Sequence, residues 1–594
     1  MKLPLALALS AVLVGADHPT GNCQGSTNQQ ASSFAGATTT FAFPPSGATV
    51  TENADSFPDK TKVNLFGPTP TGDEALVLAT APVAPPYVHD FPLVEPGTED
   101  ARNSSDFSVL HSWGNLSPFR SPDASHPTSF GIRNSSPRIP AGCQLTQVHL
   151  LHRHGARYPT IGAGPSKFAT ALNAVAAAGN LSAGGPLEYL NTWEYRLGAE
   201  ILTPFGRAEL FELRVGFRIK YGNLLKGFAN LPVWRTTSQE RMVDSALHFA
   251  AGFFGVQQYQ TDYHQLLEIE ALGFNTTLAP NEQCPNANNA IATIATNFTN
   301  AWAEIYLKDA QKRLAPRISG LTLNTTWLFA MQQTCAYETV ALGYSAFCDL
   351  FTEEEWKGFE YSIDLSYWYN NGPGNPAVAA QGIGWVHELV SRLTGERITA
   401  AAATTNTTIV GSNITFPLDQ PIYVDATHDT VISAGGGSFV LSGLPACAAD
   451  ILGCLVVVAM NFTSMAKTGP LPATHIPKNR SYVVNQISPF ASNLVGQVLS
   501  CPAASDSSAG STPTPTPTHI RWLLNDAVVP LDGIFGCGTS SSGLCPLDAF
   551  IAGIKQRIEE VDFELGCFGN YSIPEPGLLV GGMIGGPSAS GVAS

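Results

Sequence analysis

Two short apolar segments, each running directly into a histidine-bearing turn, place the strongest constraint on how this chain folds. Residues 147–151 (QVHLL) lead into residues 152–155 (HRHG), and residues 421–425 (PIYVD) lead into residues 426–429 (ATHD). Both segments have the length and the apolar, β-branched composition of buried strands. Helical patterns lie between them, which indicates an α/β protein whose sheet carries helices on both faces. Functional sites in such sheets lie at the carboxyl ends of strands, and both turns are placed there.

Three further segments agree with the α/β interpretation. Apolar residues recur at helical spacing over residues 205–220 and 291–314. Residues 522–531 (WLLNDAVVPL) are typical of a β-hairpin that turns at Asn525-Asp526. At 594 residues the chain exceeds the size at which one hydrophobic core stops growing, so more than one structural unit is expected.

Composition divides the chain into four regions. Residues 1–16 combine a basic start, an apolar run too short to span a bilayer and small residues at the end, which predicts a cleaved signal peptide. Residues 17–105 are rich in Ser, Thr, Ala, Pro and Gly and are predicted to be low in complexity and largely irregular. Strand and helix patterns alternate over residues 106–575, and residues 576–594 are expected to form a flexible tail.

The surface composition agrees with export from the cell. Charged residues make up 13% of the chain, well below the roughly 25% of an average globular domain, so another group must keep the surface soluble. Glycans attached at N-x-[ST] sequons are the candidates, and such sequons start at Asn103, Asn115, Asn134, Asn180, Asn275, Asn297, Asn324, Asn406, Asn413, Asn461, Asn479 and Asn570. After the predicted signal peptide, no segment has the length and apolar character of a membrane span. We therefore expect a soluble, secreted chain.

Eleven cysteines in an exported chain indicate disulfide bonds. None of them forms a CxxC pair, so a zinc site of that kind is not expected. Cys447 and Cys454 are close enough in sequence to close a small loop, as are Cys537 and Cys545. The odd count leaves one cysteine over, and Cys23, alone in the N-terminal region, is the candidate for it.

The turn after the first strand carries the clearest chemistry. Residues 153–159 read RHGARYP. Arg153 and Arg157 supply planar, permanently charged groups that bind phosphate oxygens in pairs. Their charges also lower the pKa of a neighbouring histidine, which favours a neutral, nucleophilic imidazole on His154. A nucleophilic histidine divides the hydrolysis of a phosphate ester into phosphoryl transfer and dephosphorylation.

These residues resemble a known family. RHGARYP is similar to the RHGxRxP signature of the histidine acid phosphatases, and this version resembles their fungal phytase branch. The resemblance runs from residues 111–119 to residues 525–531. It implies the histidine phosphatase, or phosphoglycerate mutase-like, fold. In this fold a smaller, mostly helical domain is inserted into the α/β domain, here within about residues 165–345, and the active site lies between the two domains.

The resemblance also implies the roles of individual residues. His154 is the nucleophile, and Arg235, from a segment similar to the family's second arginine segment, joins Arg153 and Arg157 in binding phosphate. Residues 427–430 (THDT) resemble the family's His-Asp element, in which His428 binds phosphate and Asp429 protonates the leaving oxygen. An aspartate that must hold a proton favours acidic pH. No metal ion or cofactor is implied.

The resemblance finally implies how the cysteines pair. The family pairing corresponds to Cys143–Cys501, Cys284–Cys567, Cys335–Cys348 and Cys537–Cys545, and Cys447–Cys454 would be an addition particular to this chain.

The chain departs from a phytase in the outer part of the pocket. Phytases of this kind line it with lysines, including a Lys-Lys pair that is Ser366-Tyr367 here, and the basic cluster after the first motif shrinks to Lys167. The net charge of −16 is unfavourable for attracting polyanions and argues against nucleic acids and anionic membranes as partners. We therefore predict a broad-specificity acid phosphatase acting on small phosphate monoesters, with phytase activity toward inositol phosphates as the alternative.

Three other interpretations stay open at this point. His152 and His154 are alternate strand residues and so candidate metal ligands, but the flanking arginines would repel a divalent cation. A mutase or other phosphotransferase of the same superfamily would use the same histidine chemistry, although these are mostly intracellular. A non-catalytic surface glycoprotein on the same fold is the alternative of another class.

Overall fold

The computed structural model describes the greater part of the predicted catalytic unit. The described residues are Leu93, 107–122, 129–288, 290–400, 403–428, 455–502, 516–572, 579 and 581–584. Several predictions lie outside them: the signal peptide, nearly all of the N-terminal region, most of the tail, Asp429, Cys23, the Cys447–Cys454 bridge and the Asn103 sequon.

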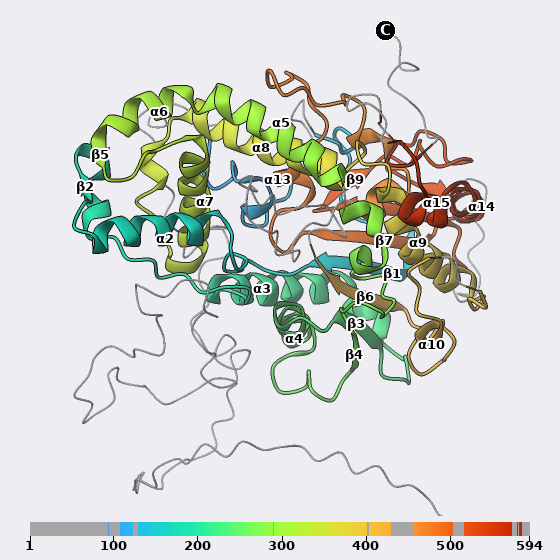
Figure 1. Ribbon diagram of the computed structural model, residues 1–594. Coiled ribbons are helices and arrows are strands. Elements are labelled where there is room, and N and C mark those ends of the chain that lie inside the picture. The colour runs from blue at the N-terminus through green and yellow to red at the C-terminus, as the bar shows by residue number, and fades with distance from the viewer. Residues whose placement is uncertain are drawn as a thin grey trace, which may run out of the picture.

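A mixed sheet of eight strands forms the centre of the fold (Figure 1). Its order is β10-β8-β7-β1-β6-β3-β4, with β9 paired to β8. The strands are β1 (Gln144–Arg153), β3 (Val233–Thr237), β4 (His264–Glu268), β6 (Ile422–Thr427), β7 (Asn493–Ser500), β8 (His519–Leu524), β9 (Ala527–Val529) and β10 (Cys545–Pro546). Strands β1, β6, β3 and β4 run parallel, whereas β7 to β10 pair antiparallel. The predicted strands at residues 147–151 and 421–425 are thus central neighbours.

Helices cover both faces of this sheet, which confirms the predicted α/β architecture. Successive residues of β1 point to opposite faces of the sheet. Val148 packs into a core that contains Phe249, and Leu151, on the other face, packs into a core that contains Trp385. The helices around the sheet are α3 (Pro204–Tyr221), α4 (Glu240–Phe254), α9 (Val378–Thr394), α10 (Thr407–Val410), α12 (Leu455–Ala459), α13 (Val484–Ile487), α14 (Leu547–Glu560) and α15 (Phe563–Phe568).

A mostly helical part lies at the other end of the molecule (Figure 1). It contains α2 (Gly164–Ala177), α5 (Ala290–Tyr306), α6 (Lys308–Leu314), α7 (Thr325–Leu342), α8 (Glu353–Asn371) and the two-stranded sheet of β2 (Ser182–Ala183) and β5 (Ile318–Ser319). The helix expected over residues 291–314 is therefore two helices. The sheet strands β3 and β4 also fall within the expected insertion at residues 165–345, so two separate segments of the chain build the helical part.

The ends of several helices follow from their sequences. Thr203 caps α3 by accepting a hydrogen bond from the N–H of Gly206, and Asn324 caps α7 in the same way. Thr352 and Glu355 form a capping box at the start of α8. Short 3-10 helices complete the fold at η2 (Gly114–Leu116), η3 (Gly185–Asn191), η4 (Gly222–Leu225), η5 (Pro280–Gln283), η6 (Pro285–Asn288), η7 (Ala315–Arg317), η8 (Cys348–Leu350) and η9 (Thr463–Met465).

The described residues contain four disulfides, two between distant parts of the chain and two that close short loops. They are Cys143–Cys501, Cys284–Cys567, Cys335–Cys348 and Cys537–Cys545, the pairing that the family resemblance implies. Cys143–Cys501 links the residue before β1 to the residue after β7. Across the described ranges, no helix combines the length and apolar character that a membrane crossing requires.

The sequon asparagines differ in their exposure. Asn115 is 3% exposed and lies in the core, which leaves no room for a glycan in the folded chain. Asn406 and Asn461 are half-buried. The exposed ones are Asn134, Asn180, Asn275, Asn297, Asn324, Asn413, Asn479 and Asn570.

Candidate active site

The RHGARYP motif begins at the last residue of β1 and is fixed by neighbouring backbone. The N–H of His154 donates to the carbonyl of Thr427 on β6 at 3.1 Å, and the carbonyl of His154 accepts from the N–H of Ala491 at 2.9 Å. A Cβ atom at Gly155 would lie 2.2 Å from the carbonyl oxygen of Gly206 in α3, so only glycine fits there. The motif is therefore held between β6, the start of β7 and the first turn of α3.

The surroundings of the His154 ring fix its protonation state. Its Nδ1 lies 2.8 Å from the carbonyl oxygen of Gly155, which only accepts hydrogen bonds. The proton is therefore on Nδ1, and Nε2 carries the lone pair. Burial, and then the charges of Arg153, Arg157 and Arg241, hold the pKa of this imidazole well below its usual value. The neutral, nucleophilic form is consequently the stable one.

Arg153 and Arg157 are positioned beside this ring by backbone carbonyls. Nη1 of Arg153 donates to the carbonyl of Ser488 at 3.0 Å, and its guanidinium carbon lies 4.4 Å from the centre of the Phe490 ring. Nη1 of Arg157 donates to the carbonyl of Tyr158 at 3.0 Å. Both arginines thus lie where the sequence predicts them, next to the candidate nucleophile.

The buried carboxylate of Glu209 binds the backbone of the RHGARYP loop. The sequence analysis did not predict this contact. Its two carboxylate oxygens accept hydrogen bonds from the backbone N–H groups of Phe119 at 2.8 Å and Ala156 at 3.2 Å. Burial raises the pKa of this carboxyl to about 7. Its partners lie 90 and 53 residues away in sequence, so no local pattern indicated the contact.

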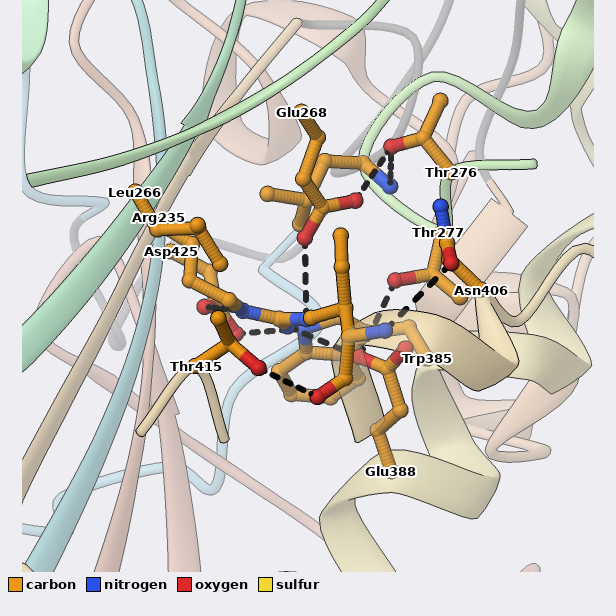
Figure 2. A network of polar contacts seen from close by, with 12 residues as sticks. Arg235, Leu266, Glu268, Thr276, Thr277, Trp385, Glu388, Asn406, Thr415 and Asp425 are labelled. Atoms are coloured by element: carbon orange, nitrogen blue, oxygen red, sulfur yellow. Dashed lines mark hydrogen bonds and ion pairs between the residues drawn. The ribbon is translucent and has the colours of Figure 1, made fainter. Parts of the chain in front are cut away.

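The assignment of Arg235 to phosphate binding is wrong. Arg235 lies inside β3, is 2% exposed, and binds three carboxylates of a buried ion cluster (Figure 2). Its guanidinium nitrogens lie 3.0 Å from Glu268, 2.8 Å from Glu388 and 2.7 Å from Asp425. Asp425 also binds Arg392 at 2.7 Å. The charge of Arg235 is therefore neutralised inside the fold.

Arg241 occupies the place that was predicted for Arg235. It is the second residue of α4, beyond the carboxyl end of β3, and its charge lowers the pKa of His154. Its Nη1 lies 2.9 Å from Oε2 of Glu200. The rule that sites gather beyond strand ends favours Arg241, but applying it requires knowing that β3 ends at Thr237.

His428 lies across the site from His154, with 6.0 Å between the two ring centroids. It directly follows β6, which is the predicted position. Its Nε2 is 2.9 Å from Oε2 of Glu270, and Oε1 of Glu270 accepts a hydrogen bond from Gln239 at 2.6 Å. Glu270 follows the end of β4 and was not predicted. Four parallel strands therefore deliver polar side chains to one edge of the sheet.

Comparison with known proteins places this arrangement in a family. The model of the "Histidine phosphatase superfamily (branch 2)" matches residues 144–525, from the first residue of β1 to the turn between β8 and β9. The chain belongs to branch 2 of the histidine phosphatase superfamily. It is accordingly a histidine acid phosphatase or phytase-like hydrolase.

Relatives of this histidine phosphatase carry one recurrent name. Phytase A of Aspergillus awamori is 29% identical over 466 residues, covering 75% of this chain and 88% of the relative. Phytase A of Neurospora crassa is 28% identical over 493 residues, covering 75% and 90%. The crystal structure of the phytase from D. castellii matches with a TM-score of 0.60 at 23% identity, covering 81% of this chain and 94% of that chain. This last likeness supports the fold.

Two further predictions for this histidine phosphatase concern a proton donor and a metal ligand. Asp429 follows His428 but lies outside the described residues, so its role as the proton donor stays a prediction. His152, the second candidate metal ligand, is fully buried and stacks on Phe249 with 4.8 Å between ring centroids. Where the chain is described, no group of three or more His, Cys, Asp or Glu residues has the arrangement to hold a metal ion.

Proposed function

We propose that this chain is a secreted acid phosphatase that hydrolyses phosphate monoesters of broad structure through a phosphohistidine intermediate on His154. One observation carries the proposal. The neutral Nε2 of His154 is surrounded by Arg153, Arg157, Arg241 and His428, a set that binds a dianion and presents a lone pair to its phosphorus atom.

The first half of the reaction transfers the phosphoryl group. Nε2 of His154 attacks phosphorus while the bond from phosphorus to the ester oxygen breaks. The arginines bind the phosphoryl oxygens, whose charge they stabilise in the transition state. Asp429 gives its proton to the leaving oxygen, which would otherwise depart as an unstable alkoxide. The products are an alcohol and a phosphorylated histidine.

The second half releases phosphate. The carboxylate of Asp429 takes a proton from a water molecule as that water attacks phosphorus, and the bond from phosphorus to Nε2 breaks. His154 returns to its neutral form, with Nδ1–H still held by the Gly155 carbonyl. Asp429 must carry a proton at the start of each cycle, so the proposed enzyme works best at acidic pH.

The residues at the positions of the phytase lysine pair favour small monoesters over phytate. Ser366 and Tyr367, which stand where fungal phytases have a lysine pair, carry no charge and are buried in α8. A polyphosphorylated ring therefore lacks this extra attraction. The names of the relatives favour the alternative, phytase activity, because the Aspergillus awamori and Neurospora crassa relatives are both called phytase A.

Three observations support secretion. The described part of the chain has four disulfides, and such bonds persist in oxidising compartments. Many of its sequons present exposed asparagines. Its first 16 residues have the pattern of a signal peptide.

The deciding experiment measures the initial rate of p-nitrophenyl phosphate hydrolysis, with a chelator present, from acidic to neutral pH. We expect an acid optimum in the wild type and loss of activity in His154→Ala. Quenching into base, in which phosphohistidine survives, should reveal a phosphorylated His154 by mass spectrometry. An inactive wild type would favour the non-catalytic glycoprotein, and an active His154→Ala would show that the nucleophile is another residue.

A second measurement separates the two substrate classes. The kcat/KM for phytate is compared with those for several small monoesters at the optimum pH. Broad specificity predicts values of similar size, whereas a phytate value far above the others would establish the phytase alternative.

A further inference from the structure

An exposed apolar surface lies at one edge of the central sheet. Strand β4 is the last strand in the sheet order and, among the described residues, pairs with β3 alone (Figure 1). Large apolar side chains of β4 and of the loop after it are exposed by 48%, 49%, 78% and 46% at Leu267, Ile269, Leu272 and Phe274. We call these four side chains the β4 patch. Single exposed apolar residues are common, but a group of them beside an open strand edge marks a site of association or aggregation.

The first two members of the patch face outward because of the alternation along the strand. Glu268 points inward, to Arg235 of the buried ion cluster, and Glu270 points inward to the candidate active site. Successive side chains of an extended segment point to opposite sides. Leu267 and Ile269 therefore lie on the outer side, where solvent covers about half of each.

The other two members lie on a short loop that follows the strand. The N–H of Phe274 donates to the carbonyl of Ala271 at 3.1 Å, and Gly273 between them has a φ of 88°, the value that a tight turn requires of glycine. The loop closes where Oγ1 of Thr276 donates to Oε2 of Glu268 at 2.6 Å (Figure 2). The patch is thus held on a segment whose two ends are joined.

The residue after Phe274 begins one of the N-x-[ST] sequons. Asn275 is exposed, whereas Thr276 and Thr277 are 0% and 2% exposed. Oγ1 of Thr277 donates to Oε2 of Glu388 in the ion cluster at 3.0 Å (Figure 2). The chain therefore passes from the buried cluster to solvent at Asn275, and this fixes the point from which a glycan extends.

The neighbouring sequon has no comparable freedom. Asn406 is half-buried, and its Oδ1 caps α10 by accepting a hydrogen bond from the N–H of Thr408 at 3.1 Å. Its Nδ2 donates to the backbone carbonyl of Asn275 at 3.2 Å. A glycan is attached to Nδ2 and needs open space beyond it, so Asn275 is the better attachment point of the two.

We propose that an N-glycan on Asn275 covers the β4 patch and prevents this sheet edge from associating. Sugar rings present C–H faces that pack on aromatic and aliphatic side chains, and Phe274 adjoins the attachment point. A covalently tethered group acts at high effective concentration, so it occupies the patch ahead of a second copy of the chain. The inference goes beyond the proposed catalysis and rests on the proposed secretion, because N-glycans are added to exported chains.

The test uses the full chain secreted by a host that adds N-glycans, as wild type, Asn275→Gln and Asn180→Gln. Asn180 is the matched control, since it is an exposed sequon residue that follows α2 in the helical part. Mass spectrometry measures the glycan occupancy of each site, and light scattering measures the oligomeric state. The dye ANS, which fluoresces on exposed apolar surface, measures how far the patch is uncovered.

We expect Asn275 to be occupied in the wild type. Asn275→Gln should bind more ANS and form dimers or larger species at concentrations where the wild type and Asn180→Gln stay monomeric. Adding Leu272→Ser to Asn275→Gln should restore low ANS fluorescence and the monomer, because the patch then loses its most exposed side chain.

A double-mutant cycle on the melting temperature tests the contact between glycan and patch. Phe274→Ala should lower the melting temperature of the wild type, and lower it by less in the Asn275→Gln background, where the glycan is already missing. Its effect in the Asn180→Gln background should equal its effect in the wild type. Additive effects of Phe274→Ala and Asn275→Gln would overturn the inference.

Other outcomes also overturn it. These are an unoccupied Asn275, wild-type ANS binding by Asn275→Gln, and a glycosylated wild-type dimer that Leu272→Ser converts to monomer, since a second copy then covers the patch. If Asn275→Gln does not fold, glycans are removed enzymatically from folded wild type and folded Leu272→Ser, and equal ANS binding overturns the inference. An inactive chain with the Asn275 glycan in place refutes the proposed catalysis alone, whereas an active chain with Asn275 unoccupied refutes this inference alone.

Discussion

Two arginines of one short segment have opposite environments. Arg235 lies within β3, where three carboxylates neutralise it, and Arg241 lies beyond the strand, where its charge acts on His154. Breaking a buried ion pair is strongly destabilising because it leaves charges uncompensated, whereas removing a phosphate-binding group mainly costs transition-state stabilisation. The two side chains should therefore respond differently to the same substitution.

We predict that Arg241→Ala lowers kcat/KM on p-nitrophenyl phosphate by about 100-fold or more while the protein stays folded. Arg235→Ala should instead lower the free energy of unfolding by about 3–5 kcal/mol. Steady-state kinetics and denaturant unfolding of both variants test this. A kinetic loss in Arg235→Ala without a loss of stability would contradict the assignment.

The residues of RHGARYP were predictable because they are contiguous. Arg153, His154 and Arg157 share one strand end whatever the rest of the chain does. The third arginine was not predictable, because the choice between two candidates depends on the exact end of β3. The contact between His428 and Glu270 spans 158 residues, and no local pattern in the sequence encodes such a pairing.

At the scale of elements, the close approach of α3 to the RHGARYP loop shapes the site. A Cβ atom at Gly206 would lie 1.9 Å from the carbonyl oxygen of Ala156. The N–H of Thr203, the N-cap of α3, donates to that same oxygen at 2.9 Å. The helix therefore begins in direct contact with the loop, and glycine is required on both sides of the contact.

We predict that Gly206→Ala displaces this helix start, lowering both kcat/KM and the melting temperature. Gly216 is the control, because it lies in the same helix and nothing stands within 4 Å of its Cβ position. Gly216→Ala should be neutral or stabilise by about 0.5–1 kcal/mol, since alanine favours helix more than glycine does. Steady-state kinetics and thermal unfolding of the two variants test this prediction. Equal kcat/KM values and equal melting temperatures in the two variants would show that the contact between α3 and the RHGARYP loop affects neither activity nor stability.

Elements with strong local signals were predicted well. The hairpin turns at Asn525 and Asp526, whose φ angles of 49° and 70° are those that Asn and Asp tolerate. The division between α5 and α6 at Leu307 was missed, because the apolar spacing continues through this buried residue. The strand order could not be predicted from the sequence, because parallel neighbours such as β3 and β6 are separated by long stretches of chain.

At the scale of the whole molecule, the surface has few charges and many exposed sequons. A glycan on a buried asparagine would prevent folding, so the folded protein cannot carry one there. We predict that mass spectrometry of the secreted protein, after enzymatic removal of N-glycans in water labelled with oxygen-18, finds label at Asn134 and other exposed positions and none at Asn115. Label at Asn115 would contradict the burial of its loop against Arg153.

The position of β1 in the sheet determines when the enzyme can form during its synthesis. The partners of this strand are β6 and β7, and Val148 pairs with Ile422, about 270 residues later. At a ribosome that adds about 5–20 residues per second, β1 waits roughly 15–55 s for its first neighbour. A nascent chain that stops before β6 thus contains the complete nucleophile motif with no sheet to hold it. The nucleophile motif can therefore be held in its final place only late in synthesis, after both β6 and β7 have been made.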